Sequence, residues 1–200
     1  MIFIEGPRNT GKTYLLEHYL RAFPNSFMTH KFPFFEFYSA LNLSSNSSEA
    51  NAFSFGKDLA LFALAKDNLL PHNLLLDRGF ISSIVFSKIF RKEKEERLVE
   101  YANLIIESFK DVDIDIVYVT PDEVGRKRAN VSAIRTKDET EMKSLTNEII
   151  LPSTYNIWYK WTLALFANCP NVRIHHFINR FDEASIEEFN GLLNSIKKTI

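Results

Sequence analysis

The strongest constraint on this chain is an eight-residue pattern near its N-terminus. Residues 6–13 read Gly-Pro-Arg-Asn-Thr-Gly-Lys-Thr and match G-x-x-x-x-G-K-[ST] without a mismatch. A short apolar run at 2–4 precedes the pattern, and apolar residues at helical spacing follow it within 13–23. Strand, glycine-rich loop and helix in this order form a phosphate-binding P-loop, because loop N–H groups and the positive helix end attract phosphate. An eight-residue match can arise by chance in a turn, but this context favours a nucleotide site.

Each residue of the loop is expected to bind a different part of a nucleoside triphosphate and its metal ion. Lys12 is expected to reach the β- and γ-phosphates, and Thr13 to offer its hydroxyl to Mg²⁺. We expect ATP rather than GTP, because no N-K-x-D base-reading motif occurs in the chain. The residues predicted to hold the nucleotide are Gly6, Pro7, Arg8, Asn9, Thr10, Gly11, Lys12, Thr13 and Tyr14.

Composition limits the class of protein further. The chain has 200 residues, 46% of them hydrophobic, and its 24 basic and 25 acidic side chains give a net charge of −1. This balance excludes a polybasic binder of nucleic acid or anionic lipid, and the length suits one domain spanning 1–200. Cys169 is the only cysteine, so no intrachain disulfide can form. A reducing, cytoplasmic location without a membrane span is expected.

The order of apolar patterns predicts an α/β fold with a largely parallel five-stranded sheet flanked by helices. The charge run at 91–97 is interpreted as a solvated junction between two helices. A long helical zone at 141–167 contains Pro152, which must bend or interrupt it. Strands are predicted at 2–4, 26–30, 74–76, 114–119 and 172–178, and helices at 13–23, 53–69, 80–90, 95–109, from 121–123 onward and at 182–198.

A second candidate motif follows the apolar run 74–76. Asp77, Arg78 and Gly79 come directly after that predicted strand, at the edge where ligands bind in open α/β sheets. An alternative is a helix-capping aspartate with a surface arginine in a nearby salt bridge. The P-loop elsewhere in the chain favours the site interpretation.

Taken together, the segment Ile4-Glu5-Gly6-Pro7, the pair Asp77-Arg78 and a later arginine-rich stretch resemble the thymidylate kinase and deoxynucleoside kinase superfamily, some of whose members are viral. The resemblance runs in order over about 1–181. It implies a three-layer P-loop kinase fold, with Arg78 holding the acceptor and Asp77 supporting Mg²⁺ or the attacking oxygen.

The resemblance also implies a lid at about 125–140. Arg128 and Arg135 are expected to close over the phosphates there; they lie seven residues apart, on one face of a continuous helix. A basic helix face neutralised by acids at 138–141 is the alternative. Arg180 is implied to lie against the adenine, and an ordinary strand-to-helix turn with Asp182 as its N-cap is the alternative there.

The sequence departs from the family pattern after the second predicted strand. Members usually carry a glutamate there that acts as base or positions the acceptor, and Glu36 is the nearest acid in this chain. Lys31 is an alternative contact to an acceptor phosphate. The phenylalanines at 32–37 form either a stacking slot for a base or part of the core.

The function expected from these features is ATP- and Mg²⁺-dependent phosphoryl transfer to a nucleotide-type acceptor, with a deoxypyrimidine monophosphate in first place. A nucleoside acceptor, or a hydroxylated base in DNA, is the alternative, and DNA is a partner only in that case. A P-loop ATPase or switch without an acceptor is a further alternative. A homodimer through 53–69 and 80–90 is also considered, although both segments suit the core equally well.

Overall fold

Short strands that are apolar on both faces form the centre of the molecule. The computed structural model describes residues 1–7, 10–24, 26–30, 48–70, 74–125 and 152–197. Its sheet has the order β2-β3-β1-β4-β5, and every neighbouring pair is parallel. The strands are β1 (Ile2–Glu5), β2 (Met28–His30), β3 (Leu74–Asp77), β4 (Ile114–Pro121) and β5 (Val172–Asn179). Parallel strands place all their carboxyl ends at one edge, so Glu5, Asp77 and Asn179 end near one another.

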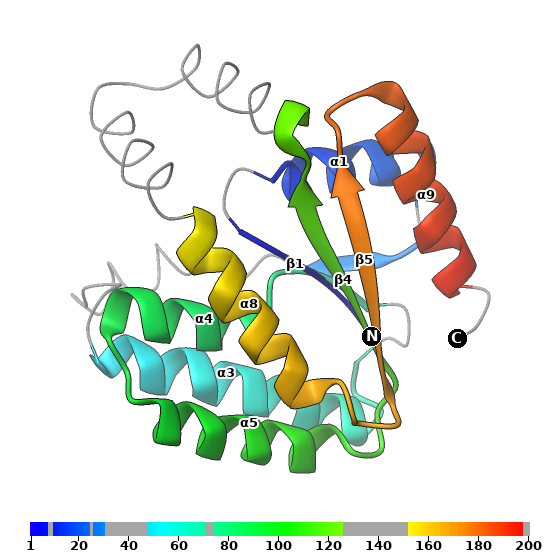
Figure 1. Ribbon diagram of the computed structural model, residues 1–200. Helices are drawn as coiled ribbons and strands as arrows, with labels where there is room; N and C mark the ends of the chain where they lie inside the picture. Colours follow the sequence, from blue (N-terminus) through cyan, green and yellow to red (C-terminus); the bar gives the residue numbers. More distant parts are fainter. Residues whose placement is uncertain (8–9, 25, 31–47, 71–73, 126–151, 198–200) are drawn as a thin grey trace.

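Helices cover both faces of this sheet (Figure 1). One layer consists of α3 (Ser48–Lys66), α4 (Phe80–Arg91), α5 (Glu95–Phe109) and α8 (Pro152–Phe166). The other consists of α1 (Lys12–Ala22) and α9 (Glu183–Lys197). Alternate residues of β1 serve the two layers, since Phe3 packs with the first set and Ile2 and Ile4 with the second. The predicted three-layer α/β architecture is therefore confirmed.

Phenylalanines form the centre of the four-helix layer. Phe80 at the start of α4 contacts the rings of Phe3, Phe62, Phe109 and Phe166 with centroid distances of 4.9 to 5.9 Å. All five rings are buried, and three of the four contacts are edge-to-face, a geometry that stabilises by about 0.5–1.5 kcal/mol beyond burial. This cluster fixes the start of α4 against β1, immediately beside the Asp77-Arg78 pair.

Most element boundaries lie within two residues of the sequence prediction, and the largest difference is in α3. Helix α3 begins at Ser48, five residues before the predicted start, and Asn68 with φ 56° follows its end at Lys66. Pro121 is the last residue of β4 rather than the start of a helix, because it continues the register with Asn179. Pro152, predicted to bend or interrupt a helical zone at 141–167, is the first residue of α8, a position that needs no backbone N–H donor; residues 141–151 lie outside the described part of the chain.

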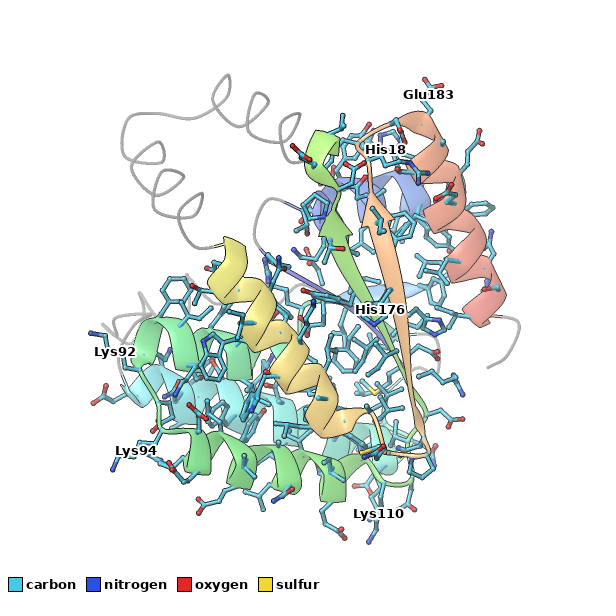
Figure 2. All side chains as sticks on the ribbon, in the orientation of Figure 1. His18, Lys92, Lys94, Lys110, His176 and Glu183 are labelled. Atoms are coloured by element: carbon cyan, nitrogen blue, oxygen red, sulfur yellow. The ribbon has the colours of Figure 1, made fainter. Side chains whose placement is uncertain are left out.

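The charged and apolar segments lie as the pattern of the sequence indicates. Lys92 and Lys94 project outward at the junction between α4 and α5, within the charge run (Figure 2). The apolar residues Ile81, Ile84 and Val85 of α4 are fully buried in the core of the same chain. Within the described residues, no helix is long and apolar enough to cross a membrane.

Candidate active site

The P-loop runs from the end of β1 to the start of α1, and its two glycines are required by its geometry. Gly6 has φ 140° and Gly11 has φ 79°, values that residues with a side chain rarely adopt. A Cβ at Gly6 would collide with the carbonyl oxygen of Val119, and one at Gly11 with the Asn179 amide and the Phe181 ring. The loop is thus wedged against the carboxyl ends of β4 and β5.

Lys12 turns back into the loop. Its side chain is buried, and Nζ donates hydrogen bonds to the carbonyl oxygen of Pro7 at 2.5 Å and to Oγ1 of Thr10 at 3.0 Å. Thr10 in turn donates to the same Pro7 oxygen at 3.1 Å. A buried ammonium needs such oxygen partners, so the charge of Lys12 is held within the loop where phosphate oxygens would bind.

Thr13 and Asp77 meet directly at the mouth of the loop. The Thr13 hydroxyl donates to Oδ2 of Asp77 at 3.0 Å, although 64 residues separate the two in the chain. Oδ1 of Asp77 is buried and has no hydrogen-bond partner among the described residues. An unpartnered buried carboxylate oxygen is costly, and a bound cation would satisfy it.

Thr13 and Asp77 supply two oxygen ligands, which fits Mg²⁺ rather than a metal ion whose ligands all come from protein side chains. The described residues contain no group of three or more His, Cys, Asp or Glu side chains arranged to hold a metal. Mg²⁺ typically takes one or two protein oxygens and completes its shell with water and phosphate oxygens. A hydroxyl and a carboxylate beside a P-loop match that requirement.

Arg78 is fixed by one of its three guanidinium nitrogens. Its Nη1 donates to the carbonyl oxygen of Gly6 at 2.9 Å, to the Tyr159 hydroxyl at 3.1 Å and to Oγ of Ser82 at 3.2 Å. The guanidinium also lies 5.0 Å from the centre of the Phe86 ring. Nε and Nη2 make no hydrogen bond to the described residues, so both nitrogens keep N–H donors that a ligand oxygen could accept.

Two acidic side chains and a tyrosine hydroxyl surround Arg78. Burial alone would lower the pKa of Arg78, but the nearby Tyr159, Glu5 and Asp77 outweigh it, and the pKa is raised. Burial raises the pKa of Tyr159 to about 12, so its hydroxyl is protonated at neutral pH and can donate. The arginine is therefore a permanent positive charge next to the P-loop.

Glu5, the last residue of β1 before the P-loop, is fully buried. Its Oε1 accepts the backbone N–H of Gly79 at 2.8 Å and that of Ser82 at 3.4 Å, while Oε2 accepts the Ser82 hydroxyl. Burial raises the pKa of Glu5, and the hydrogen bonds from Ser82 and Gly79 and the charge of Arg78 oppose that rise. The Tyr159 hydroxyl donates to the Gly6 oxygen at 2.9 Å and joins the same network.

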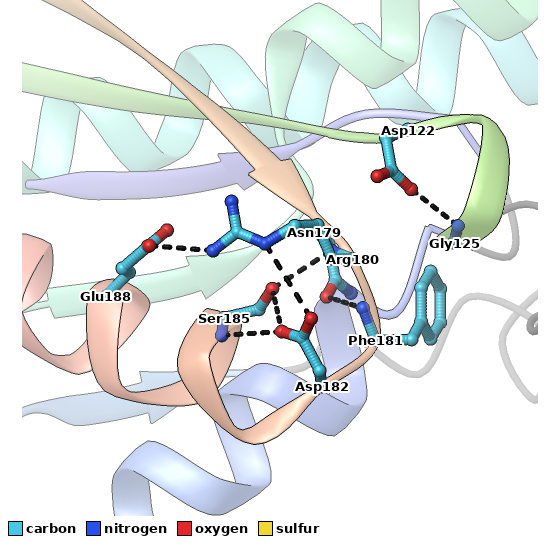
Figure 3. A network of polar contacts seen from close by, with 8 residues as sticks. All are labelled: Asp122, Gly125, Asn179, Arg180, Phe181, Asp182, Ser185 and Glu188. Atoms are coloured by element: carbon cyan, nitrogen blue, oxygen red, sulfur yellow. Dashed lines mark hydrogen bonds and ion pairs between the residues drawn. The ribbon is translucent and has the colours of Figure 1, made fainter.

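A third segment, at the end of β5, braces the loop. The buried Asn179 donates from Nδ2 to the carbonyl oxygen of Thr10 at 2.9 Å and accepts the N–H of Phe181 at 2.9 Å. Figure 3 shows Arg180 turned toward α9, where Nη2 bonds to Glu188 at 2.7 Å. Asp182 accepts the N–H of Ser185 at 2.9 Å. Asp182 thus caps α9, which is the alternative considered for this turn.

The structure brings a coherent subset of the predicted site together. Tyr14 lies at the edge of the site, 48% exposed, with its ring 4.5 Å from that of His18. Five predicted site residues and most of the lid lie outside the described residues: Arg8, Asn9, Glu36, Arg128, Arg135 and 126–140. The residues gathered at the loop and the adjoining strand end are Gly6, Pro7, Thr10, Gly11, Lys12, Thr13, Asp77 and Arg78.

Sequence reasoning gave no role to three residues that the structure places at the site. Glu5 carries a signal, since it is an acid at the end of an otherwise apolar strand directly before the loop. Asn179 and Tyr159 carry none, because each reaches the loop from more than 150 residues away. Only the fold reveals those contacts.

Comparison with known proteins supports the fold. No family model and no curated protein matches the sequence. Deoxyadenosine kinase from M. mycoides with bound dCTP matches with a TM-score of 0.53 and 15% identity, over 98% of this chain and 100% of that one.

Two further solved structures are similar. The YorR protein from Bacillus subtilis, in complex with phosphorylated GDP, matches with a TM-score of 0.53 and 16% identity over 98% of this chain and 95% of that one. Thymidylate kinase from Candida albicans matches with a TM-score of 0.52 and 15% identity over 99% of this chain and 90% of that one. These likenesses extend over nearly the whole chain and agree with the P-loop geometry. The chain therefore has the fold of the P-loop nucleoside and nucleotide kinases.

Proposed function

We propose that this protein is a kinase that uses ATP and Mg²⁺ to phosphorylate a nucleotide-type acceptor, a deoxypyrimidine monophosphate. The observation that carries the proposal is the hydrogen bond between Thr13 and Asp77, with Arg78 on the same strand end. It joins the P-loop to a second pair of charged side chains. A P-loop alone serves many ATPases, whereas an adjacent open arginine suits a second, anionic substrate.

The donor would be held by residues of the loop. The N–H groups at the start of α1 would face the phosphates, and Lys12 would exchange its contacts with Pro7 and Thr10 for phosphate oxygens. Thr13 and Asp77 would hold Mg²⁺, which when bound neutralises charge on the β- and γ-phosphates. Tyr14 and Arg180 are proposed to lie along the nucleoside part of ATP.

The acceptor would meet the open edge of Arg78. Nη1 is anchored to Gly6 and Tyr159, so Nε and Nη2 can bind a phosphate or hydroxyl oxygen without moving the anchor. Glu36 is proposed as the general base. Arg128 and Arg135 are proposed to close over the transferred group, where guanidinium groups stabilise developing charge.

A nucleoside acceptor is the second candidate, because the fold is shared equally with a solved nucleoside kinase and a solved nucleotide kinase. Deoxyadenosine kinase from M. mycoides matches over 98% of this chain, and thymidylate kinase from Candida albicans matches over 99% of it. Arg78 suits both classes, because a guanidinium binds a phosphate oxygen or a sugar hydroxyl.

The decisive experiment is a product screen. Purified protein is incubated with γ-labelled ATP and Mg²⁺ and with deoxynucleoside monophosphates, nucleosides or DNA containing hydroxylated bases. We expect label to pass to a pyrimidine monophosphate. Transfer to a nucleoside or to DNA would replace that acceptor, and hydrolysis at full rate without any acceptor would favour an ATPase.

Lys12→Ala tests the donor site in the same assay. We expect transfer to fall by about 100-fold or more, as when one preorganised electrostatic contact is removed from an active site. Lys110→Ala is the matched control, because Lys110 is an exposed lysine paired with Glu107 at the far end of α5 (Figure 2). Undiminished transfer by Lys12→Ala would refute the proposed function.

A further inference from the structure

One buried charged group has no part in the proposed chemistry. Glu5 is 0% exposed and lies at the end of a strand whose other residues are apolar. Burying a carboxylate is unfavourable unless every oxygen is paired, so such a group is retained where its geometry serves a purpose. Both of its oxygens are paired, and every partner belongs to the short segment 79–82.

The first of these contacts fixes the start of α4. Gly79 precedes the helix and has no side chain with which to cap it. Glu5, at the end of β1, caps α4 instead, since its Oε1 accepts the N–H groups of Gly79 and Ser82. A carboxylate at a helix N-terminus also interacts favourably with the helix dipole. Arg78 is the residue immediately before this fixed point.

The second contact reaches the arginine side chain itself. The Ser82 hydroxyl donates to Glu5 and lies 3.2 Å from Nη1 of Arg78 and 2.9 Å from the Tyr159 hydroxyl. Nη1 and Tyr159 both bond to the Gly6 oxygen, so the network closes on the P-loop. Glu5 thus controls both the backbone and the side chain of Arg78.

The backbone of Arg78 needs such support. It has φ 73°, in the left-handed region that side-chain-bearing residues seldom occupy, and such strain persists only where surrounding contacts enforce it. The Glu5 contacts with 79–82 lie directly after this strained residue. The Arg78 N–H is itself bonded to the Ile4 oxygen at 3.0 Å, so loss of the Glu5 contacts would loosen the chain after Arg78 and allow the guanidinium to turn away.

We propose that Glu5 is a positioning residue that holds Arg78, through Ser82 and the start of α4, in the orientation that receives the acceptor. This inference rests on the proposed function and names a further residue of the same site. Glu5 touches neither donor nor acceptor, and it acts only through Arg78.

Glu5→Gln tests the inference with almost no change in shape. The amide oxygen can still accept from Gly79, but the amide nitrogen donates to Ser82 Oγ instead of accepting its proton. It therefore competes with Nη1 for that oxygen, and the negative charge near Arg78 is lost. We expect the KM for the acceptor to rise by about tenfold or more, because a small displacement of a binding group weakens catalysis strongly. The KM for ATP should stay within about twofold, since Lys12 and Thr13 are untouched.

Asp58→Asn is the matched control. Asp58 is also a buried carboxylate of the four-helix layer, 1% exposed, and it accepts a hydrogen bond from Tyr101 at 2.8 Å. Its bond with Tyr101 links α3 to α5, in a part of this layer distinct from the contacts of Glu5 with 79–82. We expect this variant to lower the melting temperature without changing either KM. A shift of both KM values in Glu5→Gln, or none, would show that Glu5 has only a structural role.

Crystal structures of the wild type and of Glu5→Gln test the positioning role of Glu5 without an activity assay. We expect Nη1 of Arg78 to leave the Gly6 oxygen in the variant; an unchanged Arg78 would overturn the inference even if the protein proves to be a kinase. If the wild type phosphorylates no acceptor, the proposed function is wrong, but the two structures still test whether Glu5 holds Arg78. If Glu5→Gln does not fold, Ser82→Ala removes the hydroxyl between Glu5 and Arg78 and gives the same two readouts.

Discussion

At the scale of single residues, the Thr13 hydroxyl is the contact that ties the P-loop to the neighbouring strand. It lies 3.0 Å from Oδ2 of Asp77, whose other oxygen has no partner among the described residues. A hydroxyl oxygen can bind Mg²⁺, whereas a methyl group in the same place cannot. Replacing the Thr13 hydroxyl by a methyl group therefore separates the proposed metal-binding role of this residue from its packing.

We predict that Thr13→Val and Thr13→Ser behave differently. Valine keeps the shape and loses the oxygen, so the Mg²⁺ concentration for half-maximal rate should rise, or the rate fall, by about 10–100-fold. Serine keeps the oxygen and should stay close to the wild type. Initial rates measured against Mg²⁺ at saturating ATP check this, and a valine variant with wild-type Mg²⁺ dependence would contradict it.

The residues that sequence reasoning identified share one property. Lys12 and Thr13 belong to a local motif with fixed spacing, and Asp77 and Arg78 follow a recognisable apolar strand. Their side chains meet because parallel strands end at one edge, which the pattern of elements predicts.

The residues that sequence reasoning missed depend on contacts between distant segments. Glu5 bonds to Ser82 across 77 positions, and Tyr159 bonds to Gly6 across 153. No local pattern encodes the identity of such partners, because burial and packing of whole layers bring them together. The sequence therefore predicts the groups proposed to bind phosphate, and it does not predict the buried groups that contact them.

At the scale of elements, two helices contain a glycine that nothing in the fold requires. Gly56 in α3 and Gly191 in α9 are exposed, and a Cβ at either position would have no neighbour within 4 Å. Glycine within a helix is unfavourable because its unfolded chain has more freedom to lose. These positions contrast with Gly11, where positive φ and close neighbours demand a glycine.

We predict that Gly191→Ala raises the free energy of unfolding by about 0.5–1 kcal/mol, and that Gly56→Ala does the same. Gly11→Ala should lower it by about 1–3 kcal/mol, because the new side chain would be strained and would collide with Asn179. Urea unfolding monitored by tryptophan fluorescence measures all three. A helix variant less stable than the wild type would contradict the assignment of open space at that glycine.

The element boundaries show what periodicity can and cannot predict. Helix α5 has the predicted bounds, because Glu95 begins an amphipathic pattern that Phe109 ends. The start of α3 lies five residues earlier than predicted, since a Ser- and Asn-rich segment carries no apolar period. Asn51, within those extra residues, is buried and bonds to Glu93 near α4. Tertiary contacts thus extend the helix beyond its own periodic signal.

At the scale of the whole molecule, the two ends of the sheet carry different polar groups. The candidate site occupies the carboxyl ends of the strands, whereas Asp115, near the amino end of β4, forms a separate cluster. Its carboxylate accepts from Arg173 at 2.9 and 2.7 Å and bonds to His175 at 2.7 Å. Burial alone would raise the pKa of Asp115, but the contacts with Arg173 and His175 outweigh it and hold the pKa below its usual value.

This cluster predicts a pH dependence of stability that is independent of the site. Because the native pKa of Asp115 lies below the unfolded value of about 3.9, the unfolded chain binds more protons in acid. The stability that Asp115 contributes is therefore present above the unfolded pKa and is lost as pH falls through the native one. The other groups that face it are the Met1 ammonium and Asp113, at the same end of the sheet.

Asp115→Asn separates this contribution from the rest of the chain. The variant should be less stable than the wild type at pH 7, because Arg173 and His175 lose their charged partner. The difference should narrow as pH falls from about 5 to about 2, since protonation removes the same charge from the wild type. Urea unfolding across this range measures the gap, and Glu100→Gln on the exposed face of α5 controls for the loss of any carboxylate. A gap that stays constant down to about pH 2 would show that Asp115 stabilises the fold by packing rather than by its charge.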